Sequence, residues 1–419
     1  MTDTPDLPTA DDVEAALPQV RTVVSRSPLQ YNERLSKSAK ARVLIKREDL
    51  QPVRSYKLRG AFNLIHGLSE ESRAKGVICA SAGNHGQGVA WTCRQLGIHA
   101  KVFVPQGTPR QKRDRIQSIG GSWVQVIVGG DSYDEAAAAA VAEAAESGAT
   151  MVHAFDDPRT IVGQGTVAPE IVDQLGQAPD VLLVPVGGGG MLAGCVSWFS
   201  ERHPETRVIG IEPTGATCLA AAVRAGGPVT LEHIDTFVDG AAVQRAGALP
   251  TQIIAKNRTE LIDVPEGQIC SEILDLYRTE GIITEPAGAL APAALRRQVR
   301  VAPHETVVAI VSGGNNDVSR YDEIIERSLI HEGRKHYFLV YFQQEPNALR
   351  RFIDDVLGPE DDITLFEYTK RSNRETGPAI VGIELGRAED LAGLLTRMEQ
   401  TNMTIERIDP DGPFYRYLV

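Results

Sequence analysis

The sequence predicts an open, doubly wound α/β fold for most of the chain, followed by a smaller α+β domain. Apolar runs alternate with helical patterns from about residue 40 to 330, and some runs, such as VLLVPV and VVAIV, are apolar at every position. Continuous apolar runs suit strands that are buried on both faces of a parallel sheet. Strand-helix alternation is typical of open α/β sheets, in which ligands bind beyond the carboxyl ends of the strands.

The expected strands are short apolar segments that end in glycine-rich or polar turns. They lie at residues 42–46, 77–81, 100–104, 122–128, 151–153, 181–186, 207–212 and 306–311. Helical patterns fall between them, for example in GQGVAWTCRQLG and DSYDEAAAAAVAEAAES.

The pattern changes near residue 330. HYFLVYF, PNALRRFIDDVLG, DITLFEYTK and AIVGIEL are followed by AEDLAGLLTRMEQ and TIERID. This is the order strand, helix, strand, strand, helix, strand, which is the split-βαβ arrangement. We predict a separate small α+β domain; an extension packed on the same core is the alternative.

Composition narrows the class of protein. The net charge of -12 argues against a nucleic-acid partner, which requires clustered Lys and Arg. The five cysteines are scattered without a C-x-x-C pair, which fits a reducing compartment. The N-terminal segment lacks the apolar region of a signal peptide, and no run approaches the roughly 18 apolar residues of a membrane span. We therefore expect a cytoplasmic protein with no membrane partner.

The strand at 181–186 runs directly into four glycines and then into the helical pattern MLAGCVSWF. Without Cβ atoms the backbone can curl around an anion and aim N–H groups at it, and the helix N-terminus adds partial positive charge. We predict a phosphate site here rather than a flexible turn. Gly188, Gly190 and Ala193, with Glu212 after the next strand, also satisfy the dinucleotide fingerprint, so this segment alone equally allows a nicotinamide or flavin enzyme.

A second turn of this kind, SAGNHGQG, follows the strand GVICA and opens a helix. Its glycines, Ser81 and free amides can form another anion-binding nest, and Asn84 offers a side-chain amide. An ordinary helix cap by a serine or asparagine explains the same pattern equally well. His85 alone is more typical of a capped surface histidine than of a catalytic residue.

Lys57 lies in SYKLRGA, just after the strand and loop LIKREDLQPV, so we expect it to open a helix. A lone lysine is usually a solvated surface charge. When it is buried near a phosphate and a helix N-terminus, its neutral amine is favoured, as Schiff-base chemistry requires.

Two other segments are uninformative in isolation. The strand at 306–311 leads into Ser312 and the turn GGNN, which would bring the Ser312 hydroxyl to the same crevice. Glu285 begins EPAGA and is either a buried acid or the start of a helix.

In this order, KREDLQPVRSYKLRGA, SAGNHGQG, VPVGGGGMLAG, EPAGA and SGGNND resemble the threonine dehydratases (threonine ammonia-lyases). These are fold-type II pyridoxal phosphate (PLP) enzymes of the tryptophan synthase β-subunit superfamily. The resemblance runs from about residue 27 to the C-terminus. It implies open parallel sheets in two subdomains of a PLP-dependent catalytic domain at 11–333, with a smaller mobile subdomain at roughly 46–155. It also implies an ACT-like (ferredoxin-like) regulatory domain at 334–419.

The resemblance also implies roles for single residues. Lys57 would carry PLP as a Schiff base, Asn84 would bind its phenolic oxygen, and Ser312 would face its pyridine nitrogen. The phosphate would lie against the amides of Gly187, Gly188, Gly189, Gly190 and Met191. The substrate carboxylate would lie against Ser81, Ala82, Gly83, Asn84 and His85.

The implied reaction is α,β-elimination from L-threonine, and from L-serine, as the first committed step of isoleucine biosynthesis. L-threonine would give 2-oxobutanoate and ammonia. Two departures from related serine racemases refine this expectation. Ala82 replaces a serine that supplies an acid/base group, so racemisation should be poor. Cys218 stands where an acidic ligand of the racemase's metal loop would fall, so we expect no divalent metal.

The tail resembles the short, single ACT-like domain of these dehydratases, through HYFLVYF, PNALRRFIDDVLGP and NRETGPAIVGIEL. It implies inhibition by isoleucine, opposed by valine, through a domain interface in a homotetramer. Asn347 stands in the first turn where glycine is usual, and asparagine tolerates left-handed φ better than most residues.

Three alternatives remain open at this point. A dinucleotide-dependent oxidoreductase would rest on the glycine turn and Glu212. A non-enzymatic amino-acid sensor would use the tail with an inactive core. A catabolic serine/threonine dehydratase would use the same fold, although such enzymes commonly lack a long tail.

Overall fold

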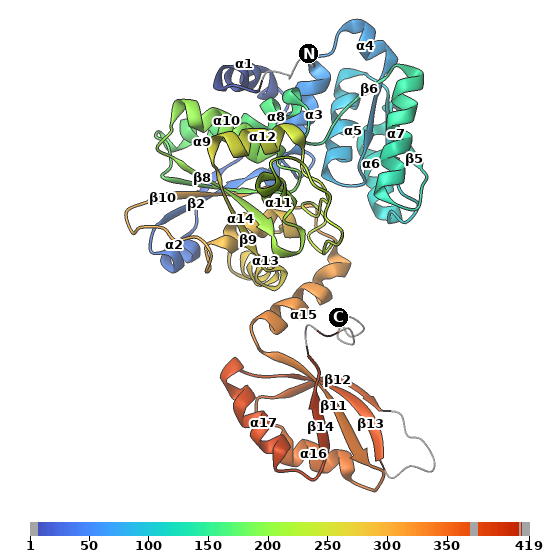
Figure 1. The fold of residues 1–419 in the computed structure, drawn as a ribbon, viewed down its shortest axis with the longest axis vertical. Coiled ribbons are helices and arrows are strands. Elements are labelled where there is room, and N and C mark those ends of the chain that lie inside the picture. The colour runs from blue at the N-terminus through green and yellow to red at the C-terminus, as the bar shows by residue number, and fades with distance from the viewer. Residues whose placement is uncertain (1–6, 369–375, 410–411, 413–419) are drawn as a thin grey trace. The chain divides into compact units, whose positions relative to one another are not determined.

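The computed structural model describes residues 7–368, 376–409 and 412, and these form two compact units. The first unit contains the chain up to Glu266 together with residues 276–316; the second contains residues 267–275 and the chain from Asp317 onward. Two sheets of parallel strands, one of them edged by an antiparallel strand, lie in the first unit, and an antiparallel sheet lies in the second (Figure 1). The predicted functional boundary between residues 333 and 334 stays a prediction.

The larger sheet of the first unit has the strand order β1-β2-β10-β7-β8-β9. Every neighbouring pair is parallel except β1 with β2. The strands β7 and β10 are buried at every position, as their continuous apolar runs predict. The strands are β1 (Leu29–Tyr31), β2 (Arg42–Arg47), β7 (Val181–Pro185), β8 (Arg207–Pro213), β9 (Glu260–Val264) and β10 (Thr306–Val311).

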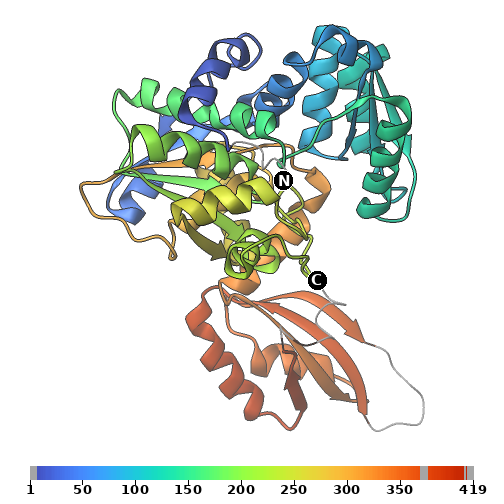
Figure 2. The ribbon, with the colours of Figure 1, turned by 45° about the horizontal axis from the view of Figure 1, so that its top comes forward.

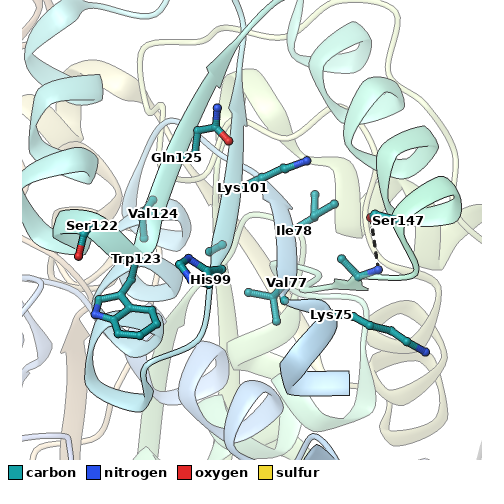
Figure 3. Close-up of a pocket in the computed structure, with 13 residues that line it drawn as sticks. Lys75, Val77, Ile78, His99, Lys101, Ser122, Trp123, Val124, Gln125 and Ser147 are labelled. Carbon is teal, nitrogen blue, oxygen red and sulfur yellow. Dashed lines mark hydrogen bonds between the residues drawn. The ribbon is translucent and has the colours of Figure 1, made fainter. Parts of the chain in front are cut away.

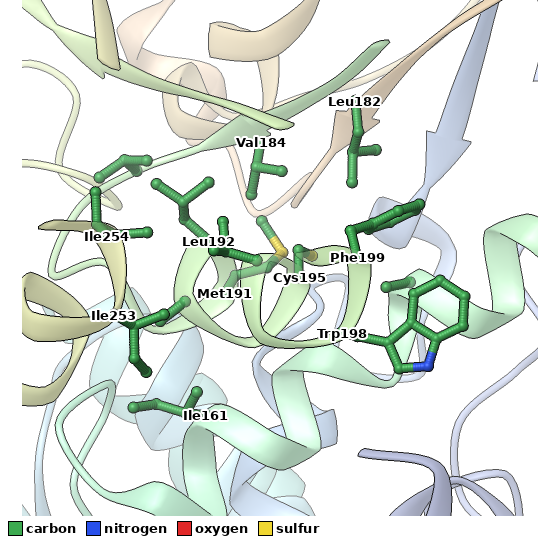
Figure 4. Close-up of a cluster of buried hydrophobic side chains, with 14 of the residues drawn as sticks. Ile161, Leu182, Val184, Met191, Leu192, Cys195, Trp198, Phe199, Ile253 and Ile254 are labelled. Atoms are coloured by element: carbon green, nitrogen blue, oxygen red, sulfur yellow. The ribbon is translucent and has the colours of Figure 1, made fainter. Parts of the chain in front are cut away.

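Helix α10 (Gly190–Arg202) lies at the centre of the core on one face of this sheet. Figure 4 shows its residues Met191, Leu192 and Cys195 among side chains of the sheet and of neighbouring helices. Helix α14 (Pro286–Ala294) packs against β7 to β10. Further helices of the first unit are α1 (Ala10–Val20), α2 (Glu33–Ala39), α8 (Pro158–Gly165), α9 (Val167–Leu175), α11 (Cys218–Ala225) and α12 (Ala248–Asn257). Helix α13 (Glu266–Glu280) contains residues of both units.

The smaller sheet is parallel throughout, with the order β5-β4-β3-β6. Figure 2 shows helices packed along this sheet. Helices α3 and α5 contribute side chains to one of its core clusters, and α7 contributes to another. The strands are β3 (Val77–Ala80), β4 (Ala100–Val104), β5 (Val124–Val128) and β6 (Thr150–Met151). The helices are α3 (Lys57–His66), α4 (Glu70–Lys75), α5 (Asn84–Leu96), α6 (Arg110–Gly120) and α7 (Tyr133–Ser147).

The predicted fold class and all eight predicted strands of the first unit are confirmed, with small differences at the ends. The strand expected at 122–128 begins at Val124, because residues 121–123 form a 3-10 turn. The strand expected at 151–153 has only two residues. The sequence does not predict β1, which has only three residues, or β9, whose segment ELIDV is interrupted by acidic residues.

The second unit has the predicted order strand, helix, strand, strand, helix, strand, and its sheet order β12-β13-β11-β14 is that of ferredoxin-like folds. A cluster of buried side chains lies within the tail itself, which favours a separate domain over an extension on a shared core. Asn347 adopts a left-handed φ of 68° at the start of α16, as its turn requires. The segment NRETGPAIVGIEL, which resembles part of the regulatory domain, spans residues 373–385, and its first three residues lie outside the described residues. The elements are α15 (Tyr321–His331), β11 (Lys335–Gln343), α16 (Ala348–Val356), β12 (Asp362–Tyr368), β13 (Thr376–Glu384), α17 (Leu391–Glu399) and β14 (Thr404–Arg407).

All five cysteines are buried, and none of them forms a disulfide within the described residues. None of the helices in the described ranges has both the length and the apolar character that a membrane crossing requires.

Candidate active site

The parallel strands bring the predicted polar turns to the carboxyl edges of the two sheets. The glycine turn follows β7, Ser312 follows β10, and the loop to Lys57 follows β2. Backbone contacts join two of these turns directly. The Tyr56 amide donates to the Ser312 carbonyl at 3.1 Å, and Ser55 pairs with Gly313.

Lys57 is the first residue of α3, as its motif predicts. Its side chain is half-buried, and Nζ donates to the carbonyl of Ala154 at 3.2 Å. The common alternative, a solvated surface lysine, is therefore wrong here. Phe155, the next residue along the chain, lies over the glycine turn, so this contact brings Lys57 to the predicted phosphate site.

The glycine turn forms a cradle that side chains would fill. A Cβ atom on Gly188 would lie 2.3 Å from Cγ of Phe155, and one on Gly187 would lie 3.0 Å from Cα of Ala241. Within the described residues, the amides of residues 187–191 donate to no protein acceptor. Gly190 begins the thirteen-residue helix α10, whose first turn carries no acidic side chain. Free amides at a helix N-terminus suit an anion such as a phosphate group.

Asn84 does not cap its own helix. Gly83 is the N-cap of α5, whereas Nδ2 of Asn84 donates to Oε1 of Glu285 at 2.5 Å. Asn315 donates through Nδ2 both to the Val53 carbonyl (2.9 Å) and to Oδ1 of Asn84 (2.7 Å). Because a carbonyl identifies the nitrogen of Asn315, the Asn84 atom that faces it must be the oxygen. The amide of Asn84 therefore has a fixed orientation, with one N–H still free for a ligand.

The loop before α5 presents a second set of free donors. Within the described residues, the amides of Ala82, Asn84 and His85 donate to no protein acceptor, and Oγ of Ser81 accepts from the Gly83 amide at 3.3 Å. The interpretation of this loop as an anion-binding nest is thus favoured over a side-chain cap.

His85 is buried, not a surface residue. Its Nε2 lies 2.8 Å from the carbonyl of Val152, while Nδ1 has no partner in the described chain. Burial and the charge of Lys57 lower the pKa of His85 to about 3. The ring is therefore neutral, with its proton on Nε2 directed to Val152.

Ser312 is buried at the end of β10, where Oγ donates to the carbonyl of Ala287 at 3.3 Å. Glu285 is the N-cap residue of α14 and is also buried, so both interpretations of the EPAGA motif are correct. A Cβ atom on Gly313 would lie 2.1 Å from Oε1 of Glu285, which explains the glycine at this position. Burial, reinforced by Asp239, raises the pKa of Glu285 to about 7.

Replacing Glu285 with glutamine should weaken the pH dependence of stability of the cofactor-free protein. Because the pKa of Glu285 is about 7 in the fold and 4.5 for an unperturbed glutamate, the folded state binds its proton more tightly. The stabilisation from this proton is complete below pH 4.5 and is lost as the pH rises through about 7. We expect the native chain to lose about 1–3 kcal/mol more than the Glu285→Gln chain between pH 5 and pH 8.

Chemical unfolding of both chains at the two pH values measures this difference. Glu212, whose pKa is also raised to about 7, is present in both chains, so its contribution to the pH dependence of stability cancels in the comparison. An identical pH dependence in the two chains would show that Glu285 is ionised in the fold at pH 5.

The dinucleotide alternative loses its acidic residue in the fold. Both carboxylate oxygens of Glu212 accept backbone amides of α11, from Leu219 at 2.8 Å and Ala220 at 3.0 Å. Glu212 thus supports the start of α11 rather than facing a ribose.

The Cys218 thiol donates to the Gly187 carbonyl at 3.5 Å. No group of three or more potential metal ligands occurs among the described side chains, and the expected absence of a divalent metal stays a prediction.

A cavity of about 380 Å³ lies at the opposite edge of the smaller sheet, where its strands begin (Figure 3). Both lysines that line it are already paired, Lys75 with Glu71 and Lys101 with Glu143. Since open parallel sheets bind ligands at their carboxyl edges, this cavity is not the active site.

Two family models match the chain. Residues 20–313 match the pyridoxal-phosphate dependent enzymes, and residues 326–418 match the C-terminal regulatory domain of threonine dehydratase. The biosynthetic L-threonine dehydratase of Mycobacterium bovis is 57% identical over 97% of this chain and 95% of its own length. That of Bacillus subtilis is 45% identical over 96% of this chain and 95% of its own length.

Two solved structures of related enzymes also align with most of the chain. Processed threonine deaminase isoform 2 from Solanum lycopersicum aligns with a TM-score of 0.71 and 36% identity, over 77% of this chain and 97% of that chain. Maize serine racemase aligns with a TM-score of 0.71 and 27% identity, over 78% and 99% respectively.

Proposed function

The chain belongs to the pyridoxal-phosphate dependent enzymes that carry the C-terminal regulatory domain of threonine dehydratase, and from that premise we propose that it is a biosynthetic threonine dehydratase. It converts L-threonine to 2-oxobutanoate and ammonia in the synthesis of isoleucine. The observation that carries this proposal is the 57% identity to biosynthetic L-threonine dehydratase across 97% of the chain, which includes the tail.

The residues of the candidate site fit PLP. The amides of residues 187–191 would hold its phosphate, Lys57 would bond to it, and the free N–H of Asn84 and the hydroxyl of Ser312 would bind polar atoms of its ring. When bound, PLP withdraws electrons from the substrate and so makes the Cα proton removable. The support for this assignment is the cradle without Cβ atoms and the free amides at the start of α10.

The remaining steps belong to the chain itself. The free amides of Ala82, Asn84 and His85, at the start of α5, would bind the substrate carboxylate and so orient the amino acid. The amine of Lys57 would take the proton from Cα, since it is the basic side chain that reaches the centre of the site. Ala82 has no exchangeable side-chain proton, which favours elimination over racemisation.

The second unit makes the enzyme responsive to an effector. We propose isoleucine as the inhibitor, with valine opposing it, in a cytoplasmic homotetramer. The proposed division is a catalytic domain at 11–333, containing the mobile subdomain at 46–155, and a regulatory domain at 334–419. The runner-up, a catabolic serine/threonine dehydratase, is less favoured because the regulatory tail is present.

Release of 2-oxo acid from L-threonine and from L-serine, with and without isoleucine, tests this proposal on the PLP-loaded chain. We expect 2-oxobutanoate from L-threonine and a fall in its rate when isoleucine is added. Activity without inhibition would favour the catabolic enzyme. If neither amino acid yields a 2-oxo acid, the chain is not a dehydratase and an amino-acid sensor becomes the better explanation.

A further inference from the structure

Four buried charged side chains lie together beside the helix that begins with Lys57. They come from four elements: Lys46 from β2, Glu48 from the 3-10 turn η1 (Glu48–Leu50), Arg59 from α3 and Glu170 from α9. Each side chain is 0% exposed, and the two positive charges balance the two negative ones. We refer to these four residues as the charge cluster.

Arg59 is the centre of the charge cluster. Its Nε and Nη2 donate to the two oxygens of Glu48, each at 2.8 Å, which is a bidentate contact. Its Nη1 and Nη2 donate to the two oxygens of Glu170 at 3.3 and 3.1 Å. Lys46 completes the set with a 2.5 Å bond to Glu170. The two carboxylates keep the guanidinium charged against the cost of its burial, and their hydrogen bonds give it a single orientation.

Stability is a weak explanation for such a cluster. Taking charges out of water costs free energy that their attraction only partly offsets, and apolar side chains of similar volume often stabilise as well or better. A planar guanidinium between two carboxylates instead specifies an angle and a position, because both of its donor edges are used. The charge cluster is therefore better suited to fixing geometry.

The geometry that it fixes is the first turn of α3. No side chain caps this helix, so tertiary contacts must hold its start. On one side Tyr56 donates to the Ser312 carbonyl, and α5 approaches so closely that a Cβ on Gly88 would lie 3.3 Å from the Lys57 carbonyl oxygen. Two residues along a helix are separated by about 200°, so Arg59 leaves the turn on the side away from Lys57.

We propose that Arg59 is a positioning residue, which Glu48 and Glu170 hold in place so that the first turn of α3 presents the Lys57 amine at the cofactor site. This inference rests on the proposed function of Lys57. It predicts that loosening Arg59 slows the chemistry of the Lys57 amine while leaving in place the free amides of the phosphate cradle, which belong to the turn between β7 and α10.

The test uses Arg59→Lys in the full chain, which keeps the charge and loses the bidentate geometry. Cofactor-free enzyme is mixed with PLP, and absorbance follows the bond that forms between the Lys57 nitrogen and the aldehyde carbon with loss of one water. Borohydride reduction and peptide mass locate the bond. We expect its rate to fall by about tenfold to a hundredfold, since small misplacements of a reacting group have effects of this size. Binding of pyridoxine 5'-phosphate, which lacks the aldehyde, should be unchanged.

Arg34→Lys is the matched control, because Arg34 also pairs with a carboxylate, Glu280, but in a helix of the same unit away from α3. It should form the bond at the native rate. Should Arg59→Lys fail to fold, Glu48→Gln keeps the shape of the partner and removes its charge, and should slow the reaction in the same direction.

The outcomes separate the two claims. A native chain that borohydride does not fix at Lys57 would refute the proposed function itself. A native chain that is fixed there, together with Arg59→Lys or Glu48→Gln chains that react at the native rate, would refute only the positioning role. Lower thermal stability with an unchanged rate would assign the charge cluster a purely structural role.

Discussion

Replacing Lys57 with alanine is expected to lower kcat for L-threonine by at least about 1,000-fold. Lys57 opens α3 with its amine 3.2 Å from the Ala154 carbonyl, beside the residue that covers the glycine cradle. Alanine removes both the group that would bond the cofactor and the base that would take the Cα proton. Steady-state formation of 2-oxobutanoate by the PLP-loaded chains measures the loss.

Borohydride treatment provides a second readout that does not depend on activity. It should add the reduced cofactor to the Lys57 peptide of the native chain and to no peptide of the Lys57→Ala chain. Lys75→Ala is the control, since Lys75 forms an exposed pair with Glu71 at the other edge of the smaller sheet. If the Lys57→Ala chain keeps a tenth of the native activity, another residue performs the chemistry.

Replacing Gly188 with valine is expected to raise the Kd for PLP by about 100-fold, which corresponds to about 3 kcal/mol. A Cβ at this position would lie 2.3 Å from Cγ of Phe155. Because Cγ is the first ring atom, rotation of the ring cannot relieve the contact, and either the turn or Phe155 must move. Movement of the turn spoils the set of free amides from which we expect the phosphate to gain its hydrogen bonds.

Equilibrium dialysis of PLP against the two cofactor-free chains measures this effect. Gly227→Val is the matched control, because a Cβ there has nothing within 4 Å and the backbone is not left-handed. Circular dichroism must show that the Gly188→Val chain is folded. Native affinity in a folded Gly188→Val chain would mean that the phosphate is bound elsewhere.

The parts of the fold that the sequence predicted well are those with a strong local pattern. Strands β7 and β10 are buried at every position, and every residue of the two strands except Thr306 is apolar. Asn347 shows the same agreement for a turn, since its left-handed φ follows from the residue type expected there. The missed strand β1 has three residues, and β9 is only partly buried, so neither differs locally from a loop.

The candidate site could be predicted only to the level of its motifs. The predicted residues lie in the strand-to-helix turns that their motifs indicated or in the first turn of the helix that follows, and the carboxyl edges of the parallel strands explain this placement. From the local pattern alone, a helix cap explained the Asn84 turn as well as an anion-binding nest did, and His85 was expected at the surface. The fold instead pairs Asn84 with Glu285 and Asn315, and it buries His85.

The sequence by itself determined the order of strands, helices and glycine turns, which follows from periodicity and from backbone geometry that neighbouring residues set. The family, the cofactor and the class of reaction came from the resemblance of its ordered motifs to the threonine dehydratases. Only the tertiary structure decided which polar side chains meet. The pairing of Arg59 with Glu170, or of Asn84 with Glu285, joins segments far apart in the chain. A charged side chain can be buried only when such partners surround it, because the free energy lost when an unpaired charge leaves water is larger than neighbouring residues in the sequence can compensate.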